Sequence, residues 1–279
     1  MTVTGPVSTA TTGTGTDRDG TAGNQPVVVL TYGHAGGQIL QALLGAQPEL
    51  ACTAGTGVLP ACAQAAVAWR QVDGRPEAPL SALAVTSIRR LAVQMITVIA
   101  ARTGRPRWCE TAAADPSGAE TFLRLFPAAR FVCLHRACPD VVSALLQASP
   151  WGLSGPAFAP YVTASPFSTA AALAAWWAGH AGPLLAFEHD HPEACLRVRF
   201  EDLADDPGGV LQDLLSFLGL PTKAVGLPQL QLPDQPNQPP GRVAGAGVAS
   251  QFPVGQLPPD LVRRVNELHA QFGYPPLAT

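Results

Sequence analysis

The sequence predicts a single α/β domain, a P-loop-like three-layer sandwich whose mostly parallel sheet lies between two layers of helices. Two observations lead to this fold class. Short runs rich in β-branched residues alternate with helical stretches along the chain, a pattern typical of doubly wound parallel sheets. The first run is followed by a glycine-rich turn and a helix, which together form a phosphate-binding unit. A chain of 279 residues that is 47% hydrophobic can bury a sizeable core, and we place the domain at residues 26–279.

The first part of the domain begins with a buried strand. Residues 26–32 form an apolar, β-branched run that ends at Gly33. Apolar residues at helical spacing then predict a helix over 38–44, directly after the glycine-rich turn. Two further helical patterns cover residues 81–102 and 118–126.

The second part of the domain repeats this alternation. Its predicted elements are, in order, a buried strand at 130–135, a helix at 140–147, a buried helix at 170–187, a strand at 196–200, and helices at 209–218 and 260–272, the last ending at Gly273. Residues 228–247 are dense in Pro, Gln and Gly, and we expect a long loop there, of the kind that often forms a lid.

Composition excludes several partners. A formal charge of −3 argues against broad nucleic-acid binding, which needs clustered cations. Residues 170–187 carry no formal charge, but they include His180 and Pro183 and are not uniformly apolar, so we expect a buried helix and no membrane partner. The first 25 residues are rich in Thr, Gly and Ser and have no apolar run, which predicts a disordered leader and not a secretion signal.

The six cysteines form no CxxC pair, so no metal site is expected. Free cysteine behaves as a small hydrophobic residue, and the scattered pattern predicts buried thiols in a reducing compartment, hence a cytoplasmic protein.

The glycine-rich turn has an unusual composition. It reads Gly33, His34, Ala35, Gly36, Gly37 and Gln38. Three glycines allow backbone N–H groups to point at an anion, but the Lys or Arg and the Ser or Thr that normally accompany them are missing. His34 is the only ionisable group, and at a helix N-terminus we expect it to be neutral near neutral pH. A tight turn that only packs the strand against the helix is the alternative.

Several further blocks of sequence resemble the sulfotransferases, particularly the protein-tyrosine sulfotransferases and their bacterial relatives. The blocks are Ala42-Leu-Leu-Gly-Ala-Gln-Pro-Glu-Leu-Ala-Cys52, Leu125-Phe-Pro-Ala-Ala-Arg-Phe-Val-Cys-Leu-His-Arg136, Val198-Arg-Phe-Glu-Asp-Leu203 leading to Pro221, and Leu257-Pro-Pro-Asp-Leu-Val262 leading to Tyr274. They occur in the order and at the spacing of the family from about residue 26 to 277.

The resemblance implies a sulfotransferase-type fold and transfer of a sulfuryl group from 3′-phosphoadenylyl sulfate to a hydroxyl or amine. In the family the first strand–helix turn cradles the 5′-phosphosulfate, which here corresponds to residues 33–38. Arg136 matches the arginine that holds the 3′-phosphate. The family's serine falls at Ala144, and Ser143, one place early, is rotated by about 100° on a helix. Arg242 and Ser250 fall near the residues that cover the donor.

The same comparison shows departures from the family pattern. His34 falls where the family has Arg or Lys, and Gly37 and Gln38 fall where it has Thr-Thr. The catalytic Glu of the tyrosine sulfotransferases falls at Ala54 or Gly55.

Two residues remain as catalytic candidates, His34 and Glu110. The family commonly has a Lys close to the position of Glu110. Glu110 itself is either a general base or a buried partner for an arginine. Arg136 likewise has an alternative to binding the 3′-phosphate, which is to form a structural ion pair with Asp140.

Two hypotheses of function follow. The first is a sulfotransferase acting on a small apolar or aromatic acceptor. The abundance of Ala, Gly, Pro and Arg is typical of a GC-rich genome and fits an enzyme that tailors a secondary metabolite. The second is a repurposed sulfotransferase fold, in which His34 or Glu110 performs cyclisation, isomerisation or elimination, or which only binds a ligand. The partner in each case is a small molecule, and the oligomeric state stays open, a homodimer included.

Overall fold

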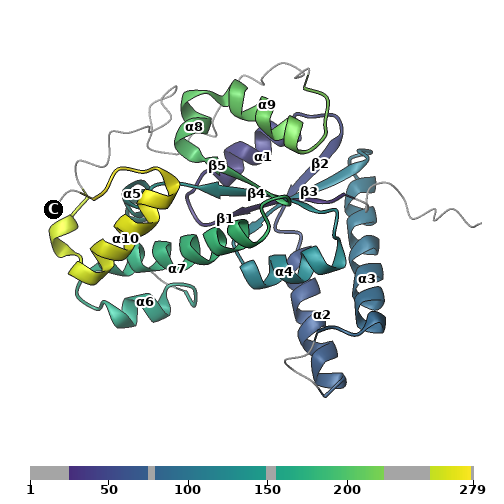
Figure 1. Cartoon of the computed structure of the whole chain (residues 1–279), viewed down its shortest axis with the longest axis horizontal. Helices are drawn as coiled ribbons and strands as arrows, with labels where there is room; N and C mark the ends of the chain where they lie inside the picture. The colour runs from purple at the N-terminus through teal and green to yellow at the C-terminus, as the bar shows by residue number, and fades with distance from the viewer. Residues whose placement is uncertain (1–24, 75–78, 149–154, 223–251, 278–279) are drawn as a thin grey trace, which may run out of the picture.

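The computed structural model describes residues 25–74, 79–148, 155–222 and 252–277. Its centre is a five-stranded sheet in the order β2-β3-β1-β4-β5, in which every pair of neighbouring strands is parallel (Figure 1). The strands are β1 (Val27–Thr31), β2 (Leu50–Ala54), β3 (Arg107–Ala113), β4 (Arg130–His135) and β5 (Cys195–Arg199).

Helices connect the strands and cover both faces of the sheet. They are α1 (Gly37–Gly45), α2 (Val58–Val72), α3 (Ala82–Ala101), α4 (Pro116–Leu125), α5 (Cys138–Ala148), α6 (Ala159–Ala164), α7 (Thr169–Asp190), α8 (Phe200–Asp205), α9 (Pro207–Phe217) and α10 (Pro259–Phe272), with the 3₁₀ turn η3 (Val254–Gln256) before α10.

The two faces of β1 show how the layers are built. Val28 and Leu30 point into a core shared with α2, α3, α4, α5, α7 and α10. Val27 and Val29 point to the opposite face, into a core shared with α1, α8 and α9. All four side chains are fully buried, which explains the continuous β-branched run, because a central parallel strand is covered on both faces. The predicted three-layer α/β sandwich with a parallel sheet is therefore confirmed.

Two strands and three helices were not predicted from the sequence. The missed elements are β2, α2, β3, α6 and α8. β2 and β3 read Leu-Ala-Cys-Thr-Ala and Arg-Trp-Cys-Glu-Thr-Ala-Ala, with few β-branched residues, so they have a weak local strand signal. Pairing with β1 and burial override this weak propensity. The predicted leader and the loop at 228–247 lie outside the described residues, apart from Gln25 at the end of the leader.

The segment at 170–187 is part of α7, a helix with a long buried face, as predicted. A different helix, α3, is the one described helix long and apolar enough to cross a membrane, judged by length and composition only. The six cysteines are unpaired; four are buried, whereas Cys52 and Cys195 are half-buried.

Candidate active site

The glycine-rich turn lies between the carboxyl end of β1 and the N-terminus of α1. Gly36 has a φ of 98°, and a Cβ there would lie 2.2 Å from the ring of Phe200. Both the left-handed backbone and the close approach of Phe200 require glycine. His34 also has a positive φ, of 62°, and among the described residues it is the one residue other than glycine that does.

Gly37 is constrained by neighbouring strands. A Cβ at this position would lie 2.8 Å from the Cγ2 atom of Thr31 and 3.2 Å from the Cγ2 atom of Thr111. The methyl groups of β1 and β3 therefore occupy the space that a side chain would need. This explains in steric terms why the turn has glycine where the resemblance points to threonine.

The turn presents free hydrogen-bond donors. Within the described part of the chain, the backbone N–H groups of Gly36, Gly37 and Gln38 have no acceptor, whereas Ala35 N–H donates to Tyr32 O over 3.1 Å. These three N–H groups open helix α1, whose dipole adds partial positive charge at the same place. The turn can therefore bind an anion even though it contains no cationic side chain.

Arg136 joins this turn from the end of β4. Its Nη1 atom donates to the carbonyl oxygen of His34 over 2.9 Å, and its guanidinium carbon lies 4.3 Å from the centre of the Phe200 ring. The Nε atom is buried and has no partner in the described residues. Burial lowers the pKa of Arg136, and neighbouring carboxylates counteract this effect, Asp140 first. Arg136 therefore lies beside the turn with one buried donor unpaired in the described residues.

The alternative for Arg136 was an ion pair with Asp140. In the described residues the two side chains form no ion pair within 4.0 Å, and Asp140 Oδ1 is buried without a hydrogen-bond partner. The carbonyl of His34, not Asp140, is the group that Arg136 contacts directly.

His34 has a lowered pKa, first because it is partly buried and second because it lies near the charge of Arg136. The direction agrees with the neutral imidazole that we expected from the sequence. The cause that dominates is desolvation, whereas the sequence argument relied on the helix dipole.

Glu110 lies on β3 and is 1% exposed. Its Oε1 atom accepts hydrogen bonds from the backbone N–H of Thr56, over 2.7 Å, and from the hydroxyl of Thr56, over 2.6 Å. Burial raises the pKa of Glu110, while the hydrogen bonds from Thr56 and Gly57 counteract it. Its partner is thus the turn before α2, and not an arginine as one interpretation of the sequence suggested.

One observation favours a catalytic role for Glu110, and another argues against it. Its side chain reaches the turn after β2, next to Ala54 and Gly55, where the family's catalytic Glu would fall. However, Glu110 pairs in register with Val28 and lies on the same face of the sheet as this residue, opposite α1. Its role as a catalytic residue stays a prediction.

The structure brings together only part of the predicted site. The turn and Arg136 are adjacent, and Glu110 is one residue before Thr111, which contacts the turn. Ser143 is half-buried on α5 and forms no hydrogen bond with the described side chains, while Arg242 and Ser250 lie outside the described residues.

Aromatic residues border the turn, and sequence reasoning assigned none of them to the donor site. Besides Phe200, Trp176 Cη2 lies 3.5 Å from the Cβ position of Gly33. Phe158 and His180 pack on Trp176, with ring centres 5.2 and 4.6 Å away. The available sequence signal was Trp176 on an apolar helix, which favours core packing over an acceptor site. In the structure Trp176 is a buried residue, 5% exposed, that packs beside Gly33.

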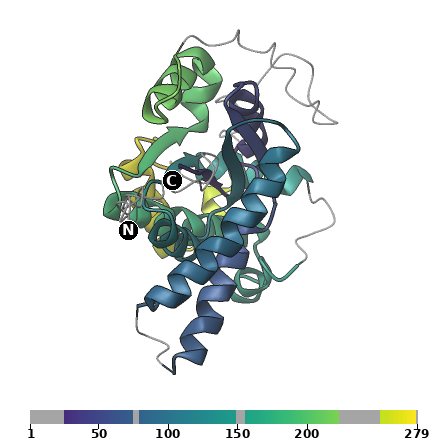
Figure 2. The ribbon, with the colours of Figure 1, turned by 90° about the vertical axis from the view of Figure 1, so that its right-hand side faces the viewer.

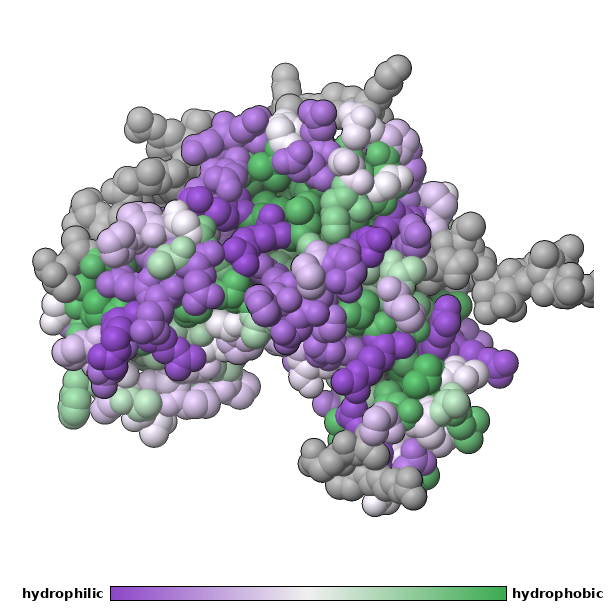
Figure 3. Space-filling model, viewed as in Figure 1, coloured by the Kyte–Doolittle hydropathy of each residue, from purple (hydrophilic) through white to green (hydrophobic). Residues whose placement is uncertain are grey.

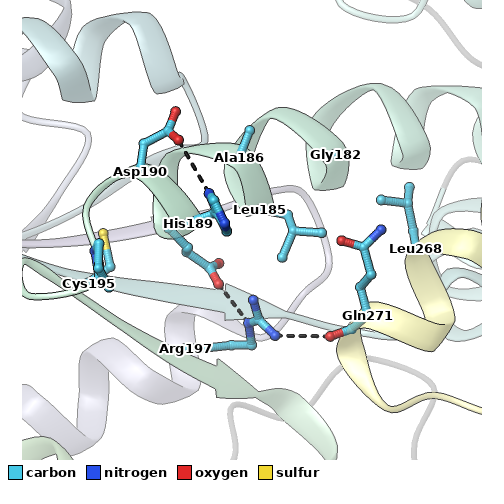
Figure 4. Close-up of a pocket in the computed structure, with 11 residues that line it drawn as sticks. Gly182, Leu185, Ala186, His189, Asp190, Cys195, Arg197, Leu268 and Gln271 are labelled. Atoms are coloured by element: carbon cyan, nitrogen blue, oxygen red, sulfur yellow. Dashed lines mark hydrogen bonds and ion pairs between the residues drawn. The ribbon is translucent and has the colours of Figure 1, made fainter.

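A separate groove runs between α7, β5 and α10, with a volume of about 750 Å³ (Figure 4). Arg197 lies at its floor, where Nε donates to Glu188 over 2.6 Å and Nη1 donates to the carbonyl of Gln271 over 3.0 Å. Glu188 also contacts the fully buried His135. Neither the turn nor Arg136 lines this groove. Within the described residues, no group of His, Cys, Asp and Glu could hold a metal ion.

Comparison with known proteins agrees with the fold and the resemblance. The model of the sulfotransferase family matches residues 26–224. No curated protein sequence matches the chain. The sulfotransferase domain of the curacin biosynthetic pathway superposes with a TM-score of 0.57 at 17% identity, covering 90% of this chain and 98% of that domain.

Two further solved structures are similar. The sulfotransferase domain of the Synechococcus PCC 7002 olefin synthase has a TM-score of 0.55 at 16% identity, covering 90% of this chain and 95% of that domain. A sulfotransferase from Alicyclobacillus acidocaldarius has a TM-score of 0.50 at 12% identity, covering 90% of this chain and 96% of that protein.

Proposed function

Because the chain belongs to the sulfotransferase family, we propose that it transfers a sulfuryl group from 3′-phosphoadenylyl sulfate to a hydroxyl or amine of a small molecule. The observation that carries the proposal is the set of free N–H groups at Gly36, Gly37 and Gln38, with Arg136 beside them. Such donors at a helix N-terminus suit a phosphosulfate, which carries several negatively charged oxygens.

The residues present fit the donor. The N–H groups of the turn would bind the 5′-phosphosulfate, and the unpaired Nε of Arg136 supplies a charge-assisted donor for a phosphate. When bound, the donor supplies the sulfuryl group and a phosphate leaving group. The turn is preorganised to meet the negative charge that builds up on the bridging oxygen as the bond to sulfur breaks.

His34 is the proposed general base. Its lowered pKa keeps the imidazole neutral at neutral pH, and His34 is only partly buried, so it is accessible beside the N–H groups of the turn. In the reaction the acceptor oxygen or nitrogen forms a bond to sulfur, the bond from sulfur to the phosphate oxygen breaks, and the acceptor's proton passes to His34. Because no cationic side chain belongs to the turn, we expect slow turnover, since losing one such group costs roughly 10²–10³ in rate.

The acceptor is proposed to be apolar or aromatic. The buried Trp176 borders Gly33, and the half-buried Phe158, just before α6, packs on Trp176, so aromatic side chains lie next to the turn. Two of the similar solved structures come from biosynthetic assemblies, an olefin synthase and the curacin pathway. These similarities support the proposal that the acceptor is an intermediate or product of secondary metabolism. The cytoplasm is proposed as the compartment on a different ground, the free cysteines of the described residues.

Calorimetry with 3′,5′-adenosine diphosphate tests the donor site. The intact chain should bind this product with a Kd of about 1–100 μM, and Arg136→Ala should weaken binding at least about tenfold, the equivalent of one lost charged hydrogen bond. Arg130→Ala is the matched control, because Arg130 begins the same strand at its opposite end. Absence of binding to the intact protein would overturn the proposed function.

One observation favours a second candidate function. Arg136, which contacts the turn in the described part of the chain, already uses Nη1 to donate to the carbonyl of His34, and the turn itself contains no Lys or Arg. A neutral His34 in a turn without its own cation suits an acid–base reaction that needs no sulfate donor, such as a cyclisation, isomerisation or elimination. A reaction that proceeds without donor and disappears in His34→Ala would support this candidate; ligand binding without turnover would instead indicate a binding protein.

A further inference from the structure

The backbone around Arg136 is held by side chains from three different elements. Three consecutive N–H groups each donate to a side chain: Arg136 to Tyr32 Oη over 3.2 Å, Ala137 to Glu201 Oε1 over 3.0 Å, and Cys138 to His269 Nε2 over 3.3 Å. The acceptors are 104, 64 and 131 positions away in the chain, so the tertiary fold, and not a local turn, produces this arrangement.

The three acceptors surround the start of α5. Tyr32 follows β1, whereas Glu201 belongs to α8 and His269 to α10. Figures 1 and 2 show α8 on one side of the sheet and α10 on the other. The surface over α10 is largely hydrophilic in Figure 3, and His269 is buried on the inner side of this helix. The start of α5 is therefore fixed from both faces of the sheet.

This arrangement closes the N-terminus of α5 to an anion. The first N–H groups of a helix have no partner within the helix and often bind anions. Here the N–H of Cys138, the first residue of α5, and the two N–H groups before it already have acceptors in the protein. At this end of β4 a phosphate would therefore meet the side chain of Arg136 and not these N–H groups.

Helix α8 acts on Arg136 in two ways. Glu201 accepts from the N–H of the residue directly after Arg136, and its carboxylate makes this hydrogen bond a strong one. The ring of the preceding residue, Phe200, lies 4.3 Å from the guanidinium carbon. Burial lowers the pKa of Arg136, and Asp140 and then Glu201 counteract this effect through their negative charge. Glu201 therefore influences both the backbone and the charge of Arg136.

We propose that Glu201 is a positioning residue, which fixes the guanidinium of Arg136 beside the glycine-rich turn. This inference rests on the proposed function, in which Arg136 binds a phosphate of the donor. The carboxylate of Glu201 contacts the N–H of Ala137. Glu201 thus acts through Arg136 and is not itself a catalytic residue.

A simpler role for Glu201 would be to stabilise the first turn of α8, because acidic side chains are favourable at a helix N-terminus. Asp202 belongs to the same turn and would fill that role equally well. Its side chain is exposed and lies 3.8 Å from Arg199, a surface contact of small energy. The hydrogen bond to Ala137 distinguishes Glu201 from Asp202, so Asp202→Ala is the matched control.

The titration of His34 reports the place of the guanidinium without any donor. Burial and the charge of Arg136 lower the pKa of His34. In Glu201→Ala the guanidinium should leave the turn, and the pKa of His34 should rise toward 6.5. Loss of the negative charge of Glu201 would by itself act in the opposite direction, because removing an anion disfavours the imidazolium. A rise in the nuclear magnetic resonance titration therefore indicates displacement of Arg136.

Two further variants complete this titration. Glu201→Gln keeps an oxygen that can accept from the N–H of Ala137, so it should largely restore the unaltered titration of His34. Asp202→Ala should leave the titration unchanged. A pKa of His34 that does not rise in Glu201→Ala would overturn the proposal.

Calorimetry with 3′,5′-adenosine diphosphate tests whether Glu201 acts through Arg136. Glu201→Ala should raise the Kd about three- to tenfold, and it should have no further effect in the presence of Arg136→Ala. Asp202→Ala should bind as the unaltered chain does. An equal loss of affinity with and without Arg136 would overturn the proposal, because Glu201 would then act independently of Arg136.

The two measurements separate this proposal from the proposed function. If the intact chain does not bind 3′,5′-adenosine diphosphate, the proposed function fails, while the titration of His34 still decides whether Glu201 positions Arg136. Far-UV circular dichroism checks that each variant is folded. If Glu201→Ala does not fold, Glu201→Asp takes its place, because it keeps the charge but shortens the side chain. The pKa of His34 should rise in this variant too, and an unchanged titration would overturn the proposal.

Discussion

Arg136 holds the carbonyl oxygen of His34 over 2.9 Å, and His34 is the one described residue other than glycine with a left-handed backbone. A non-glycine residue in this conformation costs roughly 1–2 kcal/mol, so the surrounding contacts must maintain it. The guanidinium is also close enough to the imidazole for its charge to lower the pKa of His34. Backbone conformation and electrostatics of the turn are therefore set by the same pair of residues.

The strained backbone of His34 leads to a prediction about stability. His34→Gly should be more stable than His34→Ala by about 1 kcal/mol, because glycine adopts a positive φ without steric cost. Urea unfolding of the two variants measures the difference. Both variants lack the imidazole, so both should lose turnover equally if His34 is the base. Equal stability of the two would contradict the strain at His34.

The charge of Arg136 should be visible in the titration of His34. Because burial and Arg136 lower the pKa of His34, the folded chain binds this proton less tightly than the unfolded chain. The stability that His34 contributes is therefore present above its usual pKa of 6.5 and is lost as the pH falls from 6.5 toward the lowered value. In Arg136→Ala the pKa of His34 should rise.

Nuclear magnetic resonance of the imidazole Cε1 protons measures this shift. The resonance of His34 is assigned by its absence in His34→Ala, and Arg130→Ala is the control for removing an arginine from the same strand at a distance from the turn. An unchanged His34 titration in Arg136→Ala would show that burial alone lowers the pKa.

Gly37 offers a test of packing around the turn. Gly37→Ala should destabilise the protein by about 1–3 kcal/mol, since its Cβ would lie 2.8 Å from the methyl group of Thr31. Thr31→Ser removes that methyl group but keeps the hydroxyl. The double variant should therefore be more stable than the sum of the single changes predicts, a coupling that urea unfolding of all four proteins measures. Strict additivity would mean that Thr31 does not limit the space at Gly37.

The sequence predicted the sandwich, the position of the turn and most helices, because these have local patterns. Val27 to Thr31 is a β-branched run, and three glycines mark the turn. The contacts that shape the site are not local. Phe200 packs on Gly36, and Thr111 fills the space beside Gly37, although each pair is far apart in the chain.

Glu110 shows the same limit of local patterns. Its partner Thr56 is 54 residues away, in a turn between β2 and α2, and neither of these elements was predicted. No spacing within the sequence connects the two residues. The pairing follows only from the neighbouring positions of β2 and β3 in the sheet, where Thr53 and Glu110 are in register.

The last prediction concerns the ionisation of Glu110. Because burial raises its pKa, the folded chain holds the proton on Glu110 more tightly than the unfolded chain does. The stability that the protonated Glu110 contributes is fully present below the ordinary pKa of 4.5. It is lost as the pH rises through the raised pKa of the folded chain. Glu110→Gln removes this dependence but keeps an oxygen that can accept both hydrogen bonds from Thr56. The variant should thus gain stability relative to the unaltered protein as the pH rises above 4.5, because only the unaltered protein loses the bound proton.

Urea unfolding at several pH values measures this difference, with Glu267→Gln on the exposed face of α10 as the control. A pH-independent difference for Glu110→Gln would mean that Glu110 does not titrate with a raised pKa. The same variant separates the two roles of Glu110. If Glu110 only positions the turn before α2, then Glu110→Gln keeps both binding of 3′,5′-adenosine diphosphate and turnover, because the hydrogen bonds from Thr56 persist. If Glu110 acts as the general base, binding persists and turnover is lost, since an amide cannot accept the acceptor's proton.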